Sequence, residues 1–229
     1  MYTLYVANKN YSSWSLRPWS LLRTLGIPFE ERLVPFSGGS NHARFREFSP
    51  TGKVPCLVDG STVVWDSLAI VEYVAERHAG AWPADPLARA WARSAAAEMH
   101  SGFGVLRNDC SMTVGMRIRL HRVSDALRRE VARIDELWSE GLARFGGPFL
   151  AGATFTAVGA SSLPVAFRVR SYGLELGAAA AGYAQRLLAL PSTLEWEAAA
   201  LREPWREPGH ENEILASGTV LEDRRAAPA

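Results

Sequence analysis

The chain has 229 residues, of which 48% are hydrophobic and 21% are charged, and its formal net charge is +1. A chain of this size can bury a substantial core, and a charge so close to zero gives no reason to expect nucleic acid or an anionic membrane as a partner. Two cysteines, Cys56 and Cys110, are too few for a disulfide framework, and none of the scattered histidines has zinc-ligand spacing, so we expect a metal-free protein of the reducing cytoplasm. We find neither a charged-then-apolar leader nor a run of about 18 apolar residues, which predicts no secretion signal and no membrane span.

The first 80 residues alternate between strand and helix patterns. Short runs rich in β-branched and aromatic residues predict strands, and apolar residues three or four positions apart predict helices. In chain order these are a strand at 2–7, a helix at 16–25, a strand at 28–34, a short helix at 41–48, two strands joined by a turn at Asp59-Gly60, and a helix at 67–80. This β-α-β-α-β-β-α order predicts a thioredoxin-like α/β domain, which we assign to residues 1–81.

The second half, residues 87–229, is rich in Ala, Leu, Arg and Glu and shows almost no strand pattern. One long helical face is marked by apolar residues three or four positions apart: Leu127, Val131, Ile134, Trp138 and Leu142. Further helices are expected near 87–104, 157–172, 178–189 and 191–202. We therefore predict an all-α domain after the linker at 82–86, with an irregular tail from Pro204, where prolines recur and periodicity is lost.

Three serines are crowded into the turn between the first strand and the first helix, in the stretch "NYSSWSLRPW". Ser15 is well placed as an N-cap, with Pro18 in the first helical turn, and ordinary turn chemistry can account for Ser12 and Ser13. The alternative is functional, because a hydroxyl beside the free N–H groups of a helix N-terminus can stabilise a thiolate. Trp14 stands between the serines and no cysteine lies in the turn, so the thiol would have to belong to a ligand.

Two further segments suit a ligand with a peptide-like backbone. A cis Val54–Pro55 bond would leave the N–H and C=O of Val54 free to pair with such a ligand, although most X–Pro bonds are trans. Asp66 and Ser67 begin the helix at 67–80, where they can act as a simple cap. They can equally hold the charged end of a ligand, with Ser67 and the helix N-terminus binding a carboxylate and Asp66 binding an ammonium group.

These features together resemble the cytosolic glutathione S-transferase family over nearly the whole chain. The resemblance rests on the thioredoxin-like half, the serine turn, "VP" before the third strand, "DS" before the third helix, and the helical second half. The stretch "SSWSLRPW" is similar to the zeta-class pattern SSCS-x-R and to a bacterial zeta-like subgroup. The resemblance implies glutathione as the co-substrate, a small electrophile as its reaction partner, and a homodimer.

The same resemblance implies roles for particular residues. The hydroxyl that activates the glutathione thiol is expected on Ser12, with Ser13 next and Ser15, near the bound glutathione, as the outside choice. The other contacts run along the tripeptide from its glycyl to its γ-glutamyl end: Lys53 for the glycyl carboxylate, Val54 beside a cis Pro55 for the cysteinyl backbone, and Asp66 with Ser67 for the γ-glutamyl group.

The sequence departs from the zeta pattern at several positions. Trp14 replaces the zeta cysteine and is expected to line or narrow the electrophile pocket. Ser171 stands at the position of the arginine that zeta isomerases use, with Arg168 and Arg170 nearby, which puts that activity in doubt. At 152–159 the family's aspartates are missing, and Gly159 replaces one of them. The helix that follows should begin less stably by about 1 kcal/mol, and an aspartate at 159 should raise the melting temperature.

The family places the electrophile pocket between the two halves, near residues 98–112. Phe103 and Arg107 lie one helical turn apart and are the candidate substrate-binding residues along with Trp14, although core packing alone could explain Phe103. Arg107 could hold an anionic group of the substrate or a carboxylate of glutathione. Cys110 has no evident base partner and is expected to be an inert thiol.

We therefore predict a glutathione transferase in which a serine-stabilised glutathione thiolate attacks a small electrophile. Two alternatives keep the same fold: a glutathione-dependent isomerase or peroxidase, and a module that binds glutathione or a partner protein without turnover. A carboxylate-binding arginine in the pocket would favour the isomerase, and an open apolar pocket would favour conjugation.

Overall fold

Four short strands form a mixed sheet in the N-terminal part of the computed structural model, which describes residues 1–227. The sheet order is β2-β1-β3-β4, with β1 at Tyr2–Val6, β2 at Phe29–Leu33, β3 at Cys56–Asp59 and β4 at Thr62–Trp65. Strand β1 runs parallel to β2 and antiparallel to β3. Gly60, with a φ of 59°, makes the tight turn between β3 and β4, where the sequence predicts it.

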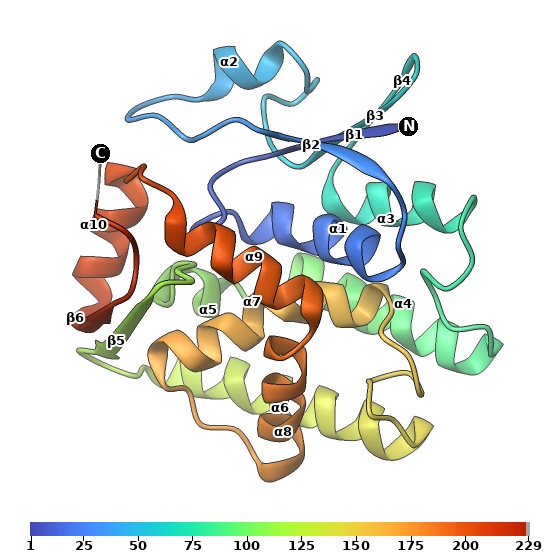
Figure 1. The fold of residues 1–229 in the computed structure, drawn as a ribbon. Coiled ribbons are helices and arrows are strands. Elements are labelled where there is room, and N and C mark those ends of the chain that lie inside the picture. Colours follow the sequence, from blue (N-terminus) through green and yellow to red (C-terminus); the bar gives the residue numbers. More distant parts are fainter. Residues whose placement is uncertain (228–229) are drawn as a thin grey trace.

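Helices cover both faces of this sheet. In Figure 1, α1 (Ser13–Thr24) and α3 (Ser67–Ala75) lie below the strands, and α2 (His42–Arg46) lies above them. The inner face is apolar because alternate strand residues point to the same side, so Leu4 and Val6 are fully buried against the helices. The thioredoxin-like fold of this half is thereby confirmed, while its predicted limits at 1–81 stay a prediction.

Helices make up most of the second half. In chain order they are α4 (Pro86–Ser101), α5 (Gly104–Asp109), α6 (Asp125–Phe145), α7 (Ala157–Tyr172), α8 (Ala178–Leu188) and α9 (Pro191–Arg202). Helix α7 is buried on nearly all sides and contacts α1, α4 and α8. It tolerates this position because small and apolar residues, rather than charged ones, surround most of its axis. None of the helices among residues 1–227 has the length and apolarity that a bilayer crossing requires.

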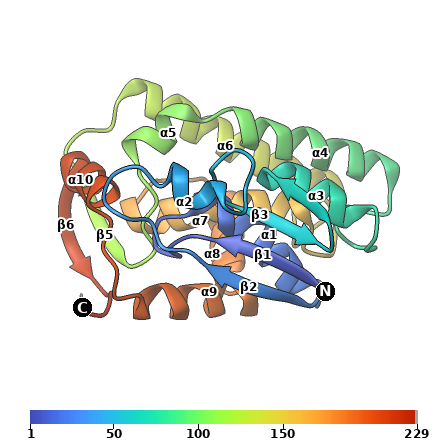
Figure 2. The same cartoon turned by 90° about the horizontal axis from the view of Figure 1, so that it is seen from above.

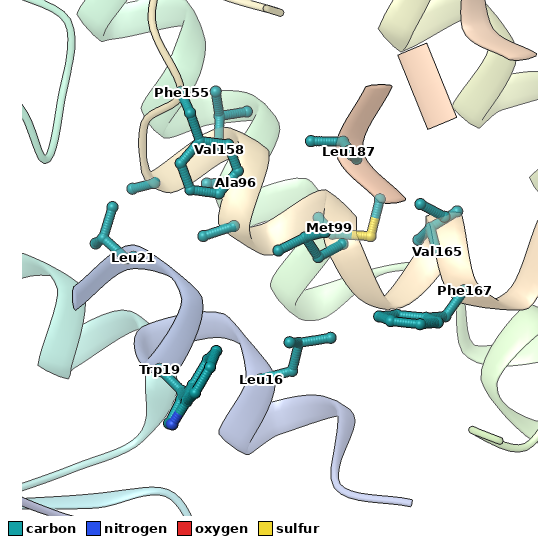
Figure 3. Close-up of a cluster of buried hydrophobic side chains, with 14 of the residues drawn as sticks. Leu16, Trp19, Leu21, Ala96, Met99, Phe155, Val158, Val165, Phe167 and Leu187 are labelled. Carbon is teal, nitrogen blue, oxygen red and sulfur yellow. The ribbon is translucent and has the colours of Figure 1, made fainter. Parts of the chain in front are cut away.

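One apolar core joins the two halves. Leu16 and Trp19 of α1 are fully buried, and Leu16 lies toward Met99 of α4 and Phe167 of α7 in Figure 3. All four belong to the same cluster of buried side chains, which also includes the inner residues of the sheet. Because α1 carries the serine turn at its N-terminus, this packing also fixes where that turn sits relative to the second half.

The C-terminal tail is not irregular, and the second half is not purely helical. Strand β5 (Met116–Leu120) pairs antiparallel with β6 (Gly218–Asp223), and α10 (Pro208–Ser217) precedes β6. Figure 2 shows β5, β6 and α10 gathered at one end of the molecule beside α5. The helical character of the second half is confirmed. The prediction of an irregular tail was wrong, because the two strands that pair are about a hundred positions apart in the chain. One of the prolines in this tail, Pro208, is the first residue of α10, where a missing N–H does no harm.

Helix α7 begins at Ala157, as the sequence predicts, but the surroundings of Gly159 change one expectation about its stability. Thr156 occupies the N-cap position, but its side chain makes no capping hydrogen bond. Gly159 lies under the Phe155 ring, and a Cβ built on Gly159 would stand 2.8 Å from ring carbons. An aspartate at 159 would press against the Phe155 ring, so we now expect it to destabilise the helix start instead of stabilising it.

Candidate active site

The serine turn begins α1 three residues earlier than the sequence predicts. Ser12 is the N-cap residue and Ser13 is the first helical residue, so the prediction that Ser15 caps the helix was wrong. Ser15 is fully buried, and its oxygen accepts the N–H of Ala7 at 3.3 Å and the hydroxyl of Ser12 at 2.7 Å. Ser15 thus ties the end of β1 to the first turn of α1. Pro18 lies further inside the helix than its first turn.

Ser12 and Ser13 face a cavity of about 420 Å³ between the two halves, called cavity A below. The hydroxyl of Ser13 makes no hydrogen bond with residues 1–227, and Ser15 does not line this cavity. The other walls come from elements far apart in the sequence: Tyr11, Trp14, Phe36, Asn41, His42, Phe45, Gly52, Lys53, Val54, Arg107, Ser111, Met112, Arg168, His210 and Glu213. The two serines therefore lie where their hydroxyl groups can donate hydrogen bonds to a ligand in cavity A.

A second cavity of about 540 Å³, called cavity B, adjoins cavity A. It brings together five predicted glutathione contacts: Lys53, Val54, Pro55, Asp66 and Ser67. The peptide bond between Val54 and Pro55 is cis, as the family resemblance implies. Trp14, Lys53 and Val54 line both cavities, so one extended ligand can reach from B into A along these residues.

Asp66 and Ser67 line cavity B with a carboxylate and a hydroxyl group. Asp66 is the N-cap of α3, with a φ of 74°, and its carboxylate accepts the N–H of Leu68 at 2.8 Å. Its other oxygen lies 3.3 Å from Nε2 of His100. The hydroxyl of Ser67 is buried without a hydrogen-bond partner among the described residues. A buried hydroxyl without a partner at a helix N-terminus is suited to bind a ligand carboxylate.

Trp14 lines both cavities, and two arginines and a histidine pack against its ring. The guanidinium carbons of Arg17 and Arg107 lie 4.1 Å and 5.6 Å from the centroid of its ring, and His100 meets the ring edge-on at 5.1 Å. Arg107 also lines cavity A, as predicted for a substrate-binding residue.

Phe103 does not share the cavity with Arg107. It is 6% exposed and borders a different hollow, next to Glu98 and Glu130. Phe103 adopts a left-handed conformation with a φ of 58° at the break between α4 and α5. The backbone N–H of Arg107 donates to the carbonyl of Phe103, so the two residues are one helical turn apart as predicted. Phe103 nevertheless does not line cavity A, and the structure therefore does not bring it into the predicted electrophile pocket.

The two cysteines have no part in the site chemistry. Both are fully buried, and burial raises the pKa of Cys56 to about 11 and that of Cys110 to about 12. A thiol with such a pKa is almost entirely protonated near neutral pH and is a poor nucleophile. The burial of Cys110 and its raised pKa agree with the expectation of an inert thiol, which stays a prediction.

The C-terminal segment supplies walls and supports that the sequence did not reveal. His210 and Glu213 of α10 line cavity A, and the His210 ring stacks between Tyr11 and Phe36 at centroid distances of 5.0 Å and 5.1 Å. The one local signal was the capping pattern at 207–210, where the Glu207 carboxylate accepts the N–H of His210.

The loop before the serines is bound to the same segment. The carboxylate of Glu203 accepts the backbone N–H of Lys9 at 2.7 Å and that of Asn10 at 3.3 Å. The indole N–H of Trp196 donates to the carbonyl of Lys9 at 2.9 Å. Residues 8–11 are thus held from the C-terminal side, which sets the backbone position of the serine turn.

Comparison with proteins of known structure identifies the class of fold. A glutathione transferase homologue from Burkholderia, solved with bound glutathione, superposes with a TM-score of 0.63 at 22% identity, over 87% of this chain and 97% of its own. A diazinon-metabolizing glutathione S-transferase of the silkworm, Bombyx mori, superposes with a TM-score of 0.68 at 17% identity, over 87% of this chain and 97% of its own. The protein therefore has the glutathione S-transferase fold.

Sequence comparison points to the same family. Residues 11–77 match the family model of the glutathione S-transferase N-terminal domain. A dichloromethane dehalogenase of Methylorubrum extorquens is 46% identical over 59 residues, which are 25% of this chain and 20% of that protein. A probable maleylacetoacetate isomerase of Caenorhabditis elegans is 32% identical over 107 residues, which are 46% of this chain and 49% of that protein. The chain thus spans about half or less of the length of these curated relatives.

Proposed function

We propose that this protein is a glutathione transferase whose serine turn stabilises the glutathione thiolate for attack on a small electrophile. The observation that carries the proposal is the junction of cavities A and B at Trp14, Lys53 and Val54. A tripeptide bound with its γ-glutamyl end at Asp66 and Ser67 can extend along Val54 and bring its thiol into cavity A, where the serines lie.

The chemistry follows from the position of the thiol at the N-terminus of α1. Free N–H groups and the positive end of the helix favour the thiolate, so the thiol loses its proton below its ordinary pKa of about 8.5. The sulfur electron pair then forms a bond to the electrophilic carbon, and the leaving group departs with the pair of its broken bond. The protein contributes a lowered thiol pKa and the positioning of both reactants.

Ser12 is the first candidate for the thiolate-stabilising hydroxyl and Ser13 is the second. Ser12 combines the position in the zeta pattern with the N-cap position. The hydroxyl of Ser12 donates to Ser15, and it can turn this proton to a sulfur while Ser15 donates to Ser12 in its place. The case for Ser13 is that its hydroxyl faces cavity A without a partner among residues 1–227.

The finer parts of the proposal rest on the family. We assign the chain to a bacterial zeta-like subgroup on the motif "SSWSLRPW", with support from the C. elegans relative. A homodimer and a cytoplasmic location follow from the same resemblance. Lys53 is proposed to hold the glycyl carboxylate, since it lines both cavities.

A second candidate function is glutathione-dependent isomerisation. The observation in its favour is that Arg107 and Arg168 both line cavity A. An isomerase returns glutathione unchanged, whereas a transferase consumes it, so glutathione consumption per turnover separates the two.

The test is an ultraviolet pH titration of protein-bound glutathione that follows thiolate absorbance in the wild type, Ser12→Ala and Ser13→Ala. We expect a bound thiol that ionises below its free pKa, and loss of the shift in one serine variant. Ser94→Ala is the matched control, because Ser94 is an exposed helical serine whose hydroxyl donates to the carbonyl of Ala90. An unshifted bound thiol would favour a binding module without turnover, and no binding would refute the proposal.

A further inference from the structure

A histidine and a carboxylate form a hydrogen-bonded pair at the wall of cavity A. Nδ1 of His210 lies 2.6 Å from Oε2 of Glu207, and the same oxygen accepts the backbone N–H of His210 at 2.8 Å. Glu207 is 7% exposed and does not line the cavity, whereas His210 does. The carboxylate thus lies behind the ring. The proposed attack of the thiolate on an electrophile uses neither residue.

The carboxyl group of Glu207 fixes which ring nitrogen of His210 carries the proton. Burial raises the pKa of this carboxyl, but the hydrogen bonds from the backbone and the ring of His210 together outweigh burial and hold the pKa below its ordinary value. An ionised carboxylate only accepts hydrogen bonds, so Nδ1 must be the donor. The neutral ring therefore carries its lone pair on Nε2, which is the form that a general base requires.

Nε2 of His210 is free to accept a proton. It makes no hydrogen bond with any of residues 1–227 and is not among their buried polar atoms, and the side chain is 29% exposed. Tyr11 and Phe36, which line the same cavity, stack on the ring and fix its orientation. Because Nδ1 is turned toward the buried Glu207, Nε2 is left to face cavity A.

Within the described part of the chain, cavity A has no second pair of this kind. His42 also lines the cavity, but no carboxylate of residues 1–227 lies within ion-pair distance of its ring. The Tyr11 ring that supports His210 belongs to the residue directly before Ser12. The base and the proposed thiolate site therefore lie close together on the wall of one cavity.

The proposed transfer reaction has no use for a base at this place. A thiolate that attacks an alkyl carbon needs no further proton transfer once the thiol has ionised. A base beside a thiolate-stabilising turn suits the opposite task, in which water attacks and glutathione leaves. A thiolate leaves more readily when its pKa is lowered, and a base makes water a better nucleophile by taking its proton.

We infer that His210 is the general base of a second activity, the hydrolysis of glutathione thioesters, with Glu207 as its positioning residue. The inference rests on the proposed function for the binding of the glutathione part, which puts the acyl group in cavity A. Nε2 takes a proton from water, and the water oxygen forms a bond to the acyl carbon. The carbon–sulfur bond then breaks, and the sulfur leaves with the electron pair as a thiolate. Once Nε2 has passed its proton to this thiolate, the products are a carboxylic acid and glutathione.

The test measures two reactions on each sample of protein. Hydrolysis of S-acetylglutathione is followed by the loss of thioester absorbance, and transfer is followed as the conjugation of glutathione with iodoacetamide. The wild type should hydrolyse the thioester above the uncatalysed rate. His210→Phe keeps an aromatic ring between Tyr11 and Phe36 but removes the nitrogens. We expect it to lower the ratio of hydrolysis to transfer, each as kcat/KM, by about 100-fold or more.

The matched control is His121→Phe, because His121 is exposed and lines neither cavity A nor cavity B. This variant should keep the wild-type ratio of hydrolysis to transfer. An unchanged ratio in His210→Phe would overturn the assignment of the base.

His210→Ala gives a readout that a packing role cannot produce. The substitution removes the ring and leaves its space, so imidazole added to the solution should restore part of the hydrolysis. The same imidazole should not restore hydrolysis in His210→Phe, where a ring still fills the space. Equal rescue of both variants, or rescue of neither, would contradict a base at this position.

Glu207→Gln tests the positioning residue. The amide oxygen can still accept the backbone N–H of His210, but the amide no longer forces the ring proton onto Nδ1. We expect kcat for hydrolysis to fall by about 10-fold or more while KM stays close to that of the wild type. A change confined to KM would contradict the positioning role.

Failure of this inference and failure of the proposed function give different results. Wild-type protein that transfers glutathione but does not hydrolyse S-acetylglutathione would overturn the second activity and leave the proposed function standing. Protein that binds neither glutathione nor its thioester would refute the proposed function, and the second activity with it.

Discussion

Ser15 joins the end of β1 to the first turn of α1. Its oxygen accepts from both Ala7 and Ser12, so it braces the turn instead of capping the helix or lining a cavity. Chain position alone could not separate these roles, because all three serines lie within four residues. The contact that decides the role is with a strand residue eight positions earlier.

Ser15→Ala should therefore affect stability. The buried N–H of Ala7 would lose its acceptor, which typically costs about 1 to 3 kcal/mol of unfolding free energy. Urea unfolding measures this loss, and Ser94→Ala should show none. An unchanged midpoint in Ser15→Ala would contradict the bracing role.

Neither cysteine should react with a thiol reagent while the chain is folded. Burial raises the pKa values of Cys56 and Cys110 to about 11 and about 12, so the reactive thiolate gains population only as the pH rises toward those values. A disulfide reagent at pH 8 should find no fast-reacting thiol in the native protein and both thiols in denaturant. Rapid modification of one native thiol would show that a cysteine is accessible.

At the scale of elements, the start of α7 reverses an expectation taken from the family motif. Replacing Gly159 should destabilise the protein, because the Phe155 ring occupies the space of the new side chain. We expect Gly159→Asp to lower the unfolding free energy by about 1 to 3 kcal/mol and to lower the melting temperature. Gly182→Asp is the comparison, since a Cβ at this helical glycine meets nothing within 4 Å. A rise in melting temperature for Gly159→Asp would restore the original expectation.

The end of α9 should control the order of the loop that precedes the serines. Glu203→Ala removes the acceptor for two buried backbone N–H groups, and we expect the unfolding free energy to fall by about 2 kcal/mol. Amide hydrogen exchange at Lys9 and Asn10 should accelerate in the same variant. Glu195→Ala is the control, because this carboxylate is 53% exposed on the same helix. Equal effects of the two substitutions would show that the hydrogen bonds from Lys9 and Asn10 to Glu203 do not contribute to stability.

At the scale of the whole molecule, the proposed pairing of subunits has a candidate surface. Strand β4 is an edge strand, and Val63 and Trp65 on it are 37% and 44% exposed. Exposed edges and apolar side chains favour association. Sedimentation equilibrium at micromolar concentration should give the mass of two chains, and Val63→Lys should shift the equilibrium toward one. A wild-type mass of one chain at all concentrations would refute the dimer.

Most of the fold was predictable because its signals are local. Strand alternation, helical spacing and the turn at Gly60 each lie within about a dozen residues, and they define the sheet and the larger helices. The β5–β6 ribbon was not predictable in this way, since Ile118 pairs with Val220. The residues of the candidate site also differ in whether a local signal predicts them. Residues that belong to recognisable motifs, such as Ser12, Val54 and Asp66, line cavities A and B. Arg168 and Glu213 line cavity A because of how α7 and α10 pack, which no local motif indicates.

The Glu203 carboxylate, which accepts the backbone N–H groups of Lys9 and Asn10, is made late during synthesis on the ribosome. These partners are 194 and 193 positions apart in the chain. At about 5 to 20 residues per second, translation needs roughly 10 to 40 s to add that stretch. A nascent chain can thus complete its four-stranded sheet while the backbone before the serines still lacks its carboxylate acceptor. The N-terminal half emerges first, but the backbone before Ser12 and Ser13 gains this acceptor only after α9 and Glu203 have docked.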